Sequence, residues 1–169
     1  MGIQARNPFE NDDLLKQDVG GQPLDGSGDD EPGDLGDLLE SIDHVAIAVH
    51  RLDEALDGYR ETFGVTVHHR EILESEGIDV ALLEVGGSYI QLLAPTRDDS
   101  DLVPFLEERG EGLHHIGYRV SDCAAALDLV MAQGHEVVDD EPRPGVGGAS
   151  IAFIHPSSFF GTLIQLVER

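Results

Sequence analysis

The feature of this chain that most constrains its fold is a repeat of one strand-and-helix pattern. The stretch IDHVAIAVHRLDEAL at 42–56 aligns without a gap with LHHIGYRVSDCAAAL at 113–127, and the alignment places His44 opposite His115. Apolar residues alternate at the start of each stretch, which predicts a strand, and then recur at helical spacing. The two halves of the chain are therefore expected to form the same elements in the same order.

The first half continues with three further predicted strands. Its helix carries apolar residues at helical spacing up to Phe63 and is expected to end at Gly64. Strands are then predicted for VTVHHREI, IDVALLEV and SYIQLLAP, which are separated by turn-forming residues around Gly77 and at 86–87. This half is thus a strand, a helix and three strands.

The second half repeats that order. Its helix runs through Cys123 and Met131 and is expected to end at Gly134, and strands are predicted near EVVDD, ASIAFIH and TLIQLVE. Between the halves, PTRDDSDLVPFLEERGEG is expected to be a linker with a short helix. A unit of one helix and four strands leaves one face of its sheet bare, so pairing two such units buries that face.

These patterns predict an α+β fold made of two tandem βαβββ modules. Module 1 is expected at about 41–95, the linker at 96–111 and module 2 at about 112–169. Residues 1–40 are rich in Gly, Asp and Pro and hold few large apolar side chains. They are predicted to be an acidic disordered tail, because they cannot bury enough surface to offset the entropy lost on ordering.

The net charge disfavours several classes of partner. The 169 residues include 34 acidic and 10 basic side chains, a formal net charge of −24. Phosphate backbones and anionic lipids repel such a chain, so we expect no nucleic-acid and no membrane partner. No apolar run approaches the roughly 20 residues of a membrane span. The acidic excess, with Lys16 as the only lysine, is similar to that of a salt-adapted, halophilic protein.

The single cysteine bears on the compartment. Cys123 allows no intrachain disulfide, which suits a reducing cytoplasm. The N-terminus lacks the basic head and apolar stretch of a signal peptide. A cytoplasmic location is therefore expected, with Cys123 acting as a small core residue on an apolar helix face.

A second repeated feature lies in the last strand of each half. YIQLL at 89–93 matches LIQLV at 163–167, so Gln91 lies opposite Gln165. Each half then offers one histidine and one glutamine, which converge if the two sheets curve around a common cavity. Imidazole nitrogens and amide oxygens form a plausible ligand set for Zn, Co, Ni, Fe or Mn. The alternative is four ordinary polar side chains paired by hydrogen bonds, but the repetition in both halves favours a metal site.

The ordered set IDHVAIAV, IQLLAPTRDDS, FLEERGEGLHHI, DEPRPGVGGASIAFIHP and GTLIQLVE resembles the vicinal oxygen chelate superfamily across about residues 42–168. Within that superfamily it is most similar to the methylmalonyl-CoA epimerases. The resemblance implies a curved mixed sheet around a metal-lined cup, a divalent metal ion, an acyl-CoA substrate and a homodimer. It also implies metal ligands at His44, Gln91, His115 and Gln165.

Two positions depart from what the resemblance implies for catalysis. The superfamily normally has a glutamate at the position of Gln165, and some members carry another at the position of Val80. An amide cannot accept the proton that epimerisation removes from the α-carbon. The catalytic residue is therefore left open. Glu84 is a candidate because it shares the strand parity of Val80, and Glu74, Glu76 and a metal-bound water are others.

Three functions are compatible with these residues. The first is a metal-dependent epimerase of methylmalonyl-CoA, which moves a proton at the α-carbon through a metal-stabilised enolate. The second is a glyoxalase-type metal lyase or isomerase. The third is a non-catalytic small-molecule-binding protein that kept the cup and lost the chemistry. The missing carboxylates favour the third function, whereas the retained His–Gln pairs favour an enzyme.

Overall fold

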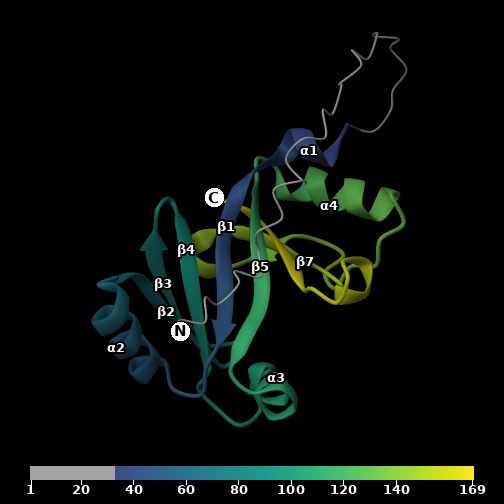
Figure 1. Ribbon diagram of the computed structural model, residues 1–169. Helices are drawn as coiled ribbons and strands as arrows, with labels where there is room; N and C mark the ends of the chain where they lie inside the picture. The colour runs from purple at the N-terminus through teal and green to yellow at the C-terminus, as the bar shows by residue number, and fades with distance from the viewer. Residues whose placement is uncertain (1–32) are drawn as a thin grey trace, which may run out of the picture. The chain divides into compact units, whose positions relative to one another are not determined.

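The computed structural model describes residues 33–169, whose strands form one curved sheet (Figure 1). The eight strands lie in the order β2-β3-β4-β1-β5-β8-β7-β6. The elements are α1 (Leu35–Leu38), β1 (Leu39–Ala48), α2 (Leu52–Phe63), β2 (Val67–Leu73), β3 (Ile78–Val85), β4 (Ser88–Pro95), α3 (Leu102–Arg109), β5 (Gly112–Val120), α4 (Cys123–Ala132), β6 (Arg143–Pro144), β7 (Ser150–Ile154) and β8 (Ile164–Glu168), with 3-10 turns at Val146–Gly148 and Pro156–Ser158. The predicted α+β class with a curved mixed sheet is confirmed.

Both modules contribute four strands with the same connectivity. The first and last strands of each module, β1 with β4 and β5 with β8, pair in parallel. The pairs within each module that involve its middle strands are antiparallel. The two first strands, β1 and β5, pair antiparallel and join the halves. The repeat in the sequence is thus a repeat in structure, and the two histidine-bearing strands lie at its centre.

Each long helix covers the outer face of its own module. Helix α2 packs Leu52 against a cluster that includes Leu83 and Leu92 of the sheet. Helix α4 does the same in module 2, where Cys123 belongs to the cluster formed with β7 and β8. Helix α2 ends where predicted, at Gly64, whose φ of 69° lies in the left-handed region that glycine favours.

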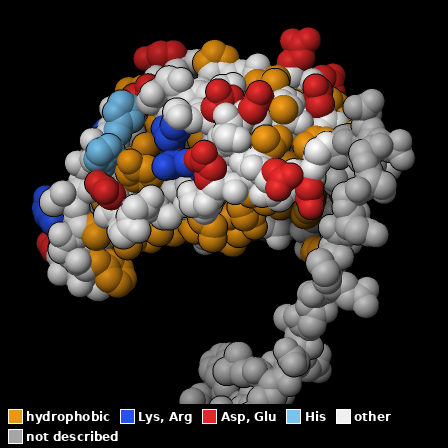
Figure 2. Space-filling model, turned by 90° about the horizontal axis from the view of Figure 1, so that it is seen from above, with side chains coloured by type: hydrophobic (Ala, Val, Ile, Leu, Met, Phe, Trp, Pro, Cys, Tyr) orange, Lys and Arg blue, Asp and Glu red, His pale blue; other side chains and the backbone are white. Residues whose placement is uncertain are grey.

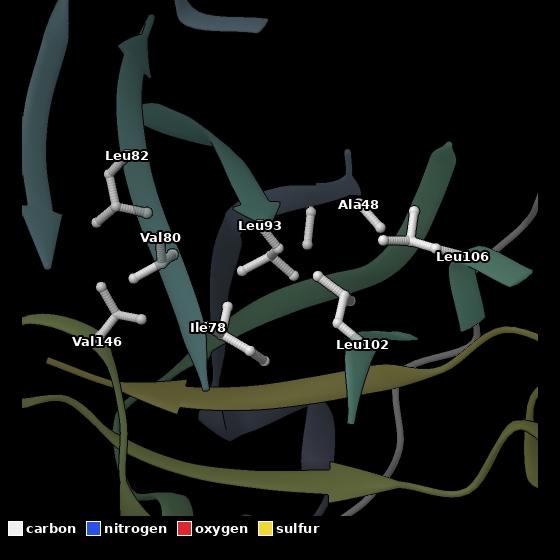
Figure 3. Close-up of a cluster of buried hydrophobic side chains, with 9 residues drawn as sticks. Ala48, Ile78, Val80, Leu82, Leu93, Leu102, Leu106 and Val146 are labelled. Carbon is white, nitrogen blue, oxygen red and sulfur yellow. The ribbon is translucent and has the colours of Figure 1, made fainter. Parts of the chain in front are cut away.

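The inner face of module 1 carries a separate apolar core. Figure 3 shows alternate residues of β3, namely Ile78, Val80 and Leu82, on the same side as Leu93 of β4. Helix α3 adds two leucines to this cluster, and Val146 from module 2 completes it. The inner face of module 1 is therefore mostly apolar, and a loop of module 2 packs against it.

The EVVDD segment is not a strand, contrary to the prediction. Val137 forms only an isolated bridge with Ile154, and the outermost strand β6 starts later and has two residues. The Asp139 carboxylate accepts a hydrogen bond from the backbone N–H of Phe153 and pairs with Arg143 at 3.1 Å. The backbone of β7 is thus partly satisfied by a side chain in place of a full neighbouring strand.

The ordered body begins before the predicted boundary at residue 41. Residues 35–38 form helix α1, and the side chain of its N-cap residue Asp34 accepts a hydrogen bond from the Gly36 N–H. Leu35 and Leu38 pack against the core under α4. The segment 35–40 was predicted to be tail and belongs to the body instead. The rest of the predicted tail, residues 1–32, lies outside the described residues.

Acidic side chains lie at several places on the face of the molecule shown in Figure 2. Figure 2 shows acidic side chains scattered between hydrophobic and uncharged ones over the face in view. Ion pairs such as Arg51–Glu54 and Arg60–Asp57 are exposed, and pairs of this kind contribute at most about 1 kcal/mol. Within residues 33–169, no helix combines the length and apolar character that crossing a membrane requires.

Candidate metal centre

The structure brings the two repeated histidines into contact. His44 lies on β1 and His115 on β5, and the two central strands place their imidazoles edge to face, with ring planes at 85°. Their Nε2 atoms are 3.0 Å apart. The residues are only 1% and 3% exposed, respectively. The convergence expected from the sequence repeat is therefore present for this pair.

A glycine makes room for the first imidazole. Gly117 on β5 is the register partner of His44, and a Cβ atom at position 117 would overlap the His44 ring. No side chain larger than hydrogen fits there unless the ring moves. Gly117 therefore leaves the space that the His44 ring occupies.

The two glutamines flank the histidines on the neighbouring strands. Gln91 of β4 is the register partner of Ala46, and Gln165 of β8 is the partner of Gly117. Both are buried and both line a cavity of about 790 Å³, which is also lined by His115. The last strands of the two modules thus bring Gln91 and Gln165 to the cavity that adjoins the histidine pair.

The donor set fits a divalent cation. Imidazole nitrogens and amide oxygens are ligands that divalent transition metals accept, and the two Nε2 atoms, 3.0 Å apart, would both be available to one ion. Burial, and then the neighbouring His44 and His114, hold the pKa of His115 well below its usual range, so the ring is in the neutral form that binds metals. Within residues 33–169, no group of three or more His, Cys, Asp or Glu side chains is placed to hold a metal ion, and this centre combines two histidines with two amides instead.

A buried carboxylate next to His44 was missed by the sequence analysis. Asp43 is fully buried, and its Oδ1 lies 2.8 Å from Nδ1 of His44. Arg119 and Arg169 each donate hydrogen bonds to the same carboxylate, at 2.8 and 3.0 Å for the shortest to Oδ2. Burial alone raises the pKa of Asp43, but hydrogen bonds from His44, Arg169 and Arg119 outweigh it and hold the pKa well below its usual range. Asp43 is therefore ionised.

His114 lies beside the second imidazole in the same manner. Its Nδ1 is 2.8 Å from Nδ1 of His115, and its ring also packs edge-on against Phe105. Burial, and then the charge of Arg109, lower the pKa of His114. The sequence analysis left this residue without a role, because it falls outside the repeated His–Gln positions.

Charged side chains line the mouth of the cavity. Arg143 donates to Glu76 at 2.8 Å and to Asp139 at 3.1 Å, so it ties the β2–β3 hairpin of module 1 to the loop of module 2. Its guanidinium lies 5.5 Å from the ring centre of Phe153, whose ring packs edge-on against His115. Among the described residues that line the cavity, Arg143 is the only Arg or Lys.

The structure does not bring Glu84 to this centre. Its side chain is 57% exposed, lies 3.6 Å from His68, and lines a separate shallow depression with Gly86 and Gly87. The strand parity behind this candidate holds, but Glu84 sits at the far end of β3, beyond the apolar Val80 and Leu82. The carboxylates that do line the cavity are Glu76, Asp101 and Asp139.

Comparison with known proteins agrees with this architecture. The sequence profile of the Glyoxalase/Bleomycin resistance protein/Dioxygenase superfamily matches residues 43–153. The ethylmalonyl-CoA/methylmalonyl-CoA epimerase of Cereibacter sphaeroides is 35% identical over 133 residues, which are 78% of this chain and 99% of that protein.

Solved structures give the same assignment. A variant of Streptomyces coelicolor methylmalonyl-CoA epimerase in complex with 2-nitronate-propionyl-CoA matches with a TM-score of 0.74 and 41% identity, over 77% of this chain and 94% of that one. A methylmalonyl-CoA epimerase in complex with methylmalonyl-CoA and NH4+ matches with the same TM-score, identity and coverage. The chain therefore belongs to the vicinal oxygen chelate superfamily, which includes the glyoxalases, and within it to the methylmalonyl-CoA epimerase family.

Proposed function

We propose that this protein is a metal-dependent epimerase of methylmalonyl-CoA. The observation that supports this most is the pair of buried imidazoles, one from each module, whose Nε2 atoms are 3.0 Å apart beside a cavity lined by two glutamines. The relatives that share this fold include methylmalonyl-CoA epimerases, and one of these is known with methylmalonyl-CoA bound. A cavity of about 790 Å³ is in the size range of small-molecule sites.

His44, His115, Gln91 and Gln165 would hold the divalent ion, whether Co, Zn, Ni, Mn or Fe. When bound, the ion supplies a Lewis acid that stabilises the negative oxygen of an enolate. Because these four side chains would all be neutral donors, the ligand set itself would add no negative charge to the ion. The glutamine at position 165 thus favours enolate stabilisation while removing a carboxylate from proton transfer.

Glu76 is the carboxylate that we assign to proton transfer, in place of Glu84. It lines the cavity and is hydrogen-bonded to Arg143, which holds it at the mouth, whereas Asp139 is already bonded to the Phe153 backbone. In the reaction the α-C–H bond breaks, its electron pair enters the enolate, and the carboxylate takes the proton. Water then donates a proton to the opposite face of the α-carbon, which completes the inversion, and Glu76 releases its proton to solvent.

The apolar walls contribute to the same step. The cavity is lined by Ile78, Leu93, Val146 and Ile151 in addition to the polar groups. Such walls limit the access of water to the enolate and strengthen each electrostatic interaction within the site.

One observation favours a second candidate function, that of a non-catalytic binding protein. Position 165 holds an amide and position 80 holds a buried valine, so neither carboxylate implied by the family resemblance is present. A protein that binds an acyl-CoA in this cup without turning it over needs the cavity and the ligand set but no base.

Proton exchange separates the two candidates. The full chain, loaded with Co2+ or Zn2+, is incubated with methylmalonyl-CoA in heavy water, and exchange of the α-proton is followed by NMR or mass spectrometry. The epimerase proposal requires exchange well above the buffer rate. Tight binding of methylmalonyl-CoA with exchange at the buffer rate would overturn it in favour of a binding protein.

We also propose that the protein is a cytoplasmic, salt-adapted homodimer. The family resemblance supports the dimer, the single cysteine suits a reducing compartment, and the net charge of −24 supports adaptation to salt. Light scattering during size-exclusion chromatography measures the molar mass of the protein and so tests whether it is a dimer. The melting temperature should rise by several degrees between low and molar salt, because ions screen the self-repulsion. An unchanged melting temperature would contradict the salt adaptation.

A further inference from the structure

Each of the two central strands carries a bulge directly before its site histidine. The register between β1 and β5 skips Asp43 just before His44, and it skips His114 just before His115. In a regular strand, neighbouring side chains point to opposite faces of the sheet. A bulge inserts one extra residue and re-aims its side chain. The two bulges therefore lie at matching positions of the repeat.

Both bulged side chains turn back onto the histidine that follows them. An Asp43 oxygen lies 2.8 Å from Nδ1 of His44, and Nδ1 of His114 lies 2.8 Å from Nδ1 of His115. In both modules, then, the residue before the histidine occupies Nδ1 and leaves Nε2 directed at the other module.

We infer that Asp43 and His114 are positioning residues that determine which ring nitrogen of the neighbouring histidine carries the proton. Asp43 permits only one tautomer of His44, whereas His114 permits both tautomers of His115. This inference rests on the proposed function only for the identity of the cation site. A hydrogen-bond partner on the far nitrogen determines the tautomer of a metal-binding histidine and its orientation.

Asp43 restricts His44 to a single tautomer. An ionised carboxylate only accepts hydrogen bonds, so Nδ1 of His44 must carry the proton and Nε2 must present its lone pair. The Asp43 carboxylate is held in this orientation because it is fully buried and accepts hydrogen bonds from two arginines. Arg119 lies near the end of β5, and Arg169 directly follows β8. Arg169 is itself held by a bond to the Val146 carbonyl.

His114 allows His115 to adopt either tautomer, because an imidazole nitrogen can either donate or accept a hydrogen bond. Without a cation, the contact between the Nε2 atoms needs one proton, and it must come from His115 because the His44 proton is on Nδ1. Nδ1 of His114 then donates to Nδ1 of His115. When both Nε2 lone pairs bind a cation, the His115 proton lies on Nδ1 and His114 accepts it. Cation binding therefore changes the tautomers of His115 and His114 but leaves that of His44 unchanged.

NMR of the full chain, labelled with 15N in histidine, tests this directly. Two-bond 15N–1H correlations report which ring nitrogen is protonated, with and without Zn2+. We expect His44 in the Nδ1–H form in both samples, and a change of His115 from Nε2–H to Nδ1–H on adding zinc. An Nε2–H form of His44 without zinc would overturn the inference. The zinc-free measurement stands even if the chain binds no metal, so failure of the proposed function is distinguishable.

Matched variants of the two bulges give a second measurement. Asp43→Asn should weaken zinc binding by roughly 10–100-fold and give His44 a mixture of tautomers, because an amide no longer excludes the Nε2–H form. His114→Gln should weaken zinc binding by less than about threefold, since its amide oxygen still accepts from Nδ1 of His115. Equal effects of the two variants, or a wild-type tautomer of His44 in Asp43→Asn, would contradict the assignment.

Folding is the control for the first variant. Asp43→Asn leaves the partly buried Arg119 and Arg169 without the carboxylate that they share, which lowers the stability of the fold. If that variant does not fold, Asp43→Asn combined with Arg169→Gln reduces the uncompensated charge and carries the same test.

Discussion

The two modules share their central strands but differ at their outer edges. In module 1 the outermost strand β2 has seven residues, whereas in module 2 the equivalent strand β6 has two. The inner strands β1 and β5 carry the same histidine and the same bulge. The repeat has thus been kept where the two halves meet and form the site, and has been lost where they do not.

The short β6 has a use in the structure. The chain that would have extended the sheet forms a loop that brings Arg143 and Val146 over the cavity. Glu71 of module 1 accepts a hydrogen bond from the Gly147 N–H of this loop at 2.6 Å. Module 2 therefore covers the cavity and also supplies most of its apolar wall, whereas module 1 contributes Leu73, Ile78 and Leu93.

The largest expected effect is at the shared centre, where the modules should be equivalent. His44→Ala and His115→Ala should each lower α-proton exchange by at least about 1,000-fold, because the enolate loses the stabilisation of a bound cation. The zinc affinity, measured by isothermal titration calorimetry, should also fall in both variants. An active variant of either kind would show that the halves are not equivalent at the centre. Circular dichroism confirms that the variants are folded.

A smaller effect should separate the modules at the mouth of the cavity. Glu76→Gln in module 1 should lower exchange by about 100-fold, because an amide cannot take the proton. Asp139→Asn in module 2 removes the other partner of Arg143 and should change exchange by less than about threefold, since an amide oxygen still accepts from the Phe153 N–H. If the Asp139 variant is the more impaired, the assignment of the base is wrong.

The two glutamines should respond differently to a carboxylate. Gln165→Glu should raise exchange by about tenfold, because it adds a second proton-transfer group where the family resemblance implies one. Gln91→Glu is the matched control in module 1 and should leave exchange unchanged or lower. A large loss in Gln165→Glu would mean that the amide at this position has a role of its own.

The smallest expected effect is on the pH dependence of stability, and it arises from the different residues at the starts of helices α2 and α4. The sequence repeat places Cys123 of α4 opposite Leu52 of α2, and burial, then the charge of Glu168, raise the pKa of the Cys123 thiol from 9.0 to about 11. A raised folded pKa gives stability that is complete below pH 9 and lost between pH 9 and 11.

Wild type should therefore lose roughly 1 kcal/mol more stability than Cys123→Ala between pH 8 and 10. Urea unfolding at both pH values measures the difference. Identical losses in the two proteins would show that the folded thiol ionises as readily as the unfolded one.

Much of the fold could be predicted because periodicity is a local property. The strands IDVALLEV and SYIQLLAP coincide with β3 and β4, and helix α2 ends at Gly64 as expected. The gapless alignment paired His44 with His115, and the separate match of YIQLL with LIQLV paired Gln91 with Gln165. The structure brings these side chains to one centre and its adjoining cavity.

What the sequence did not reveal depends on departures from regular geometry. Strict alternation places Asp43 and His114 on the outer face, and only the register of two paired strands shows that both are bulged. Parity correctly placed Glu84 on the inner face, but it does not report the distance along a strand. The EVVDD segment makes only a few backbone hydrogen bonds to its neighbour, and the Asp139 carboxylate accepts the Phe153 N–H that a strand carbonyl would otherwise accept.

The antiparallel pairing of β1 with β5 has a consequence for the origin of the chain. A lone module would expose the edge of its first strand, and such an edge is most simply satisfied by a second, identical copy. An ancestral single-module protein would then have worked as a symmetric pair with two identical half-sites. Joining the copies through one linker made their association independent of concentration. It also released each copy from self-complementarity, so that one could acquire an aspartate and the other a histidine at the same bulge.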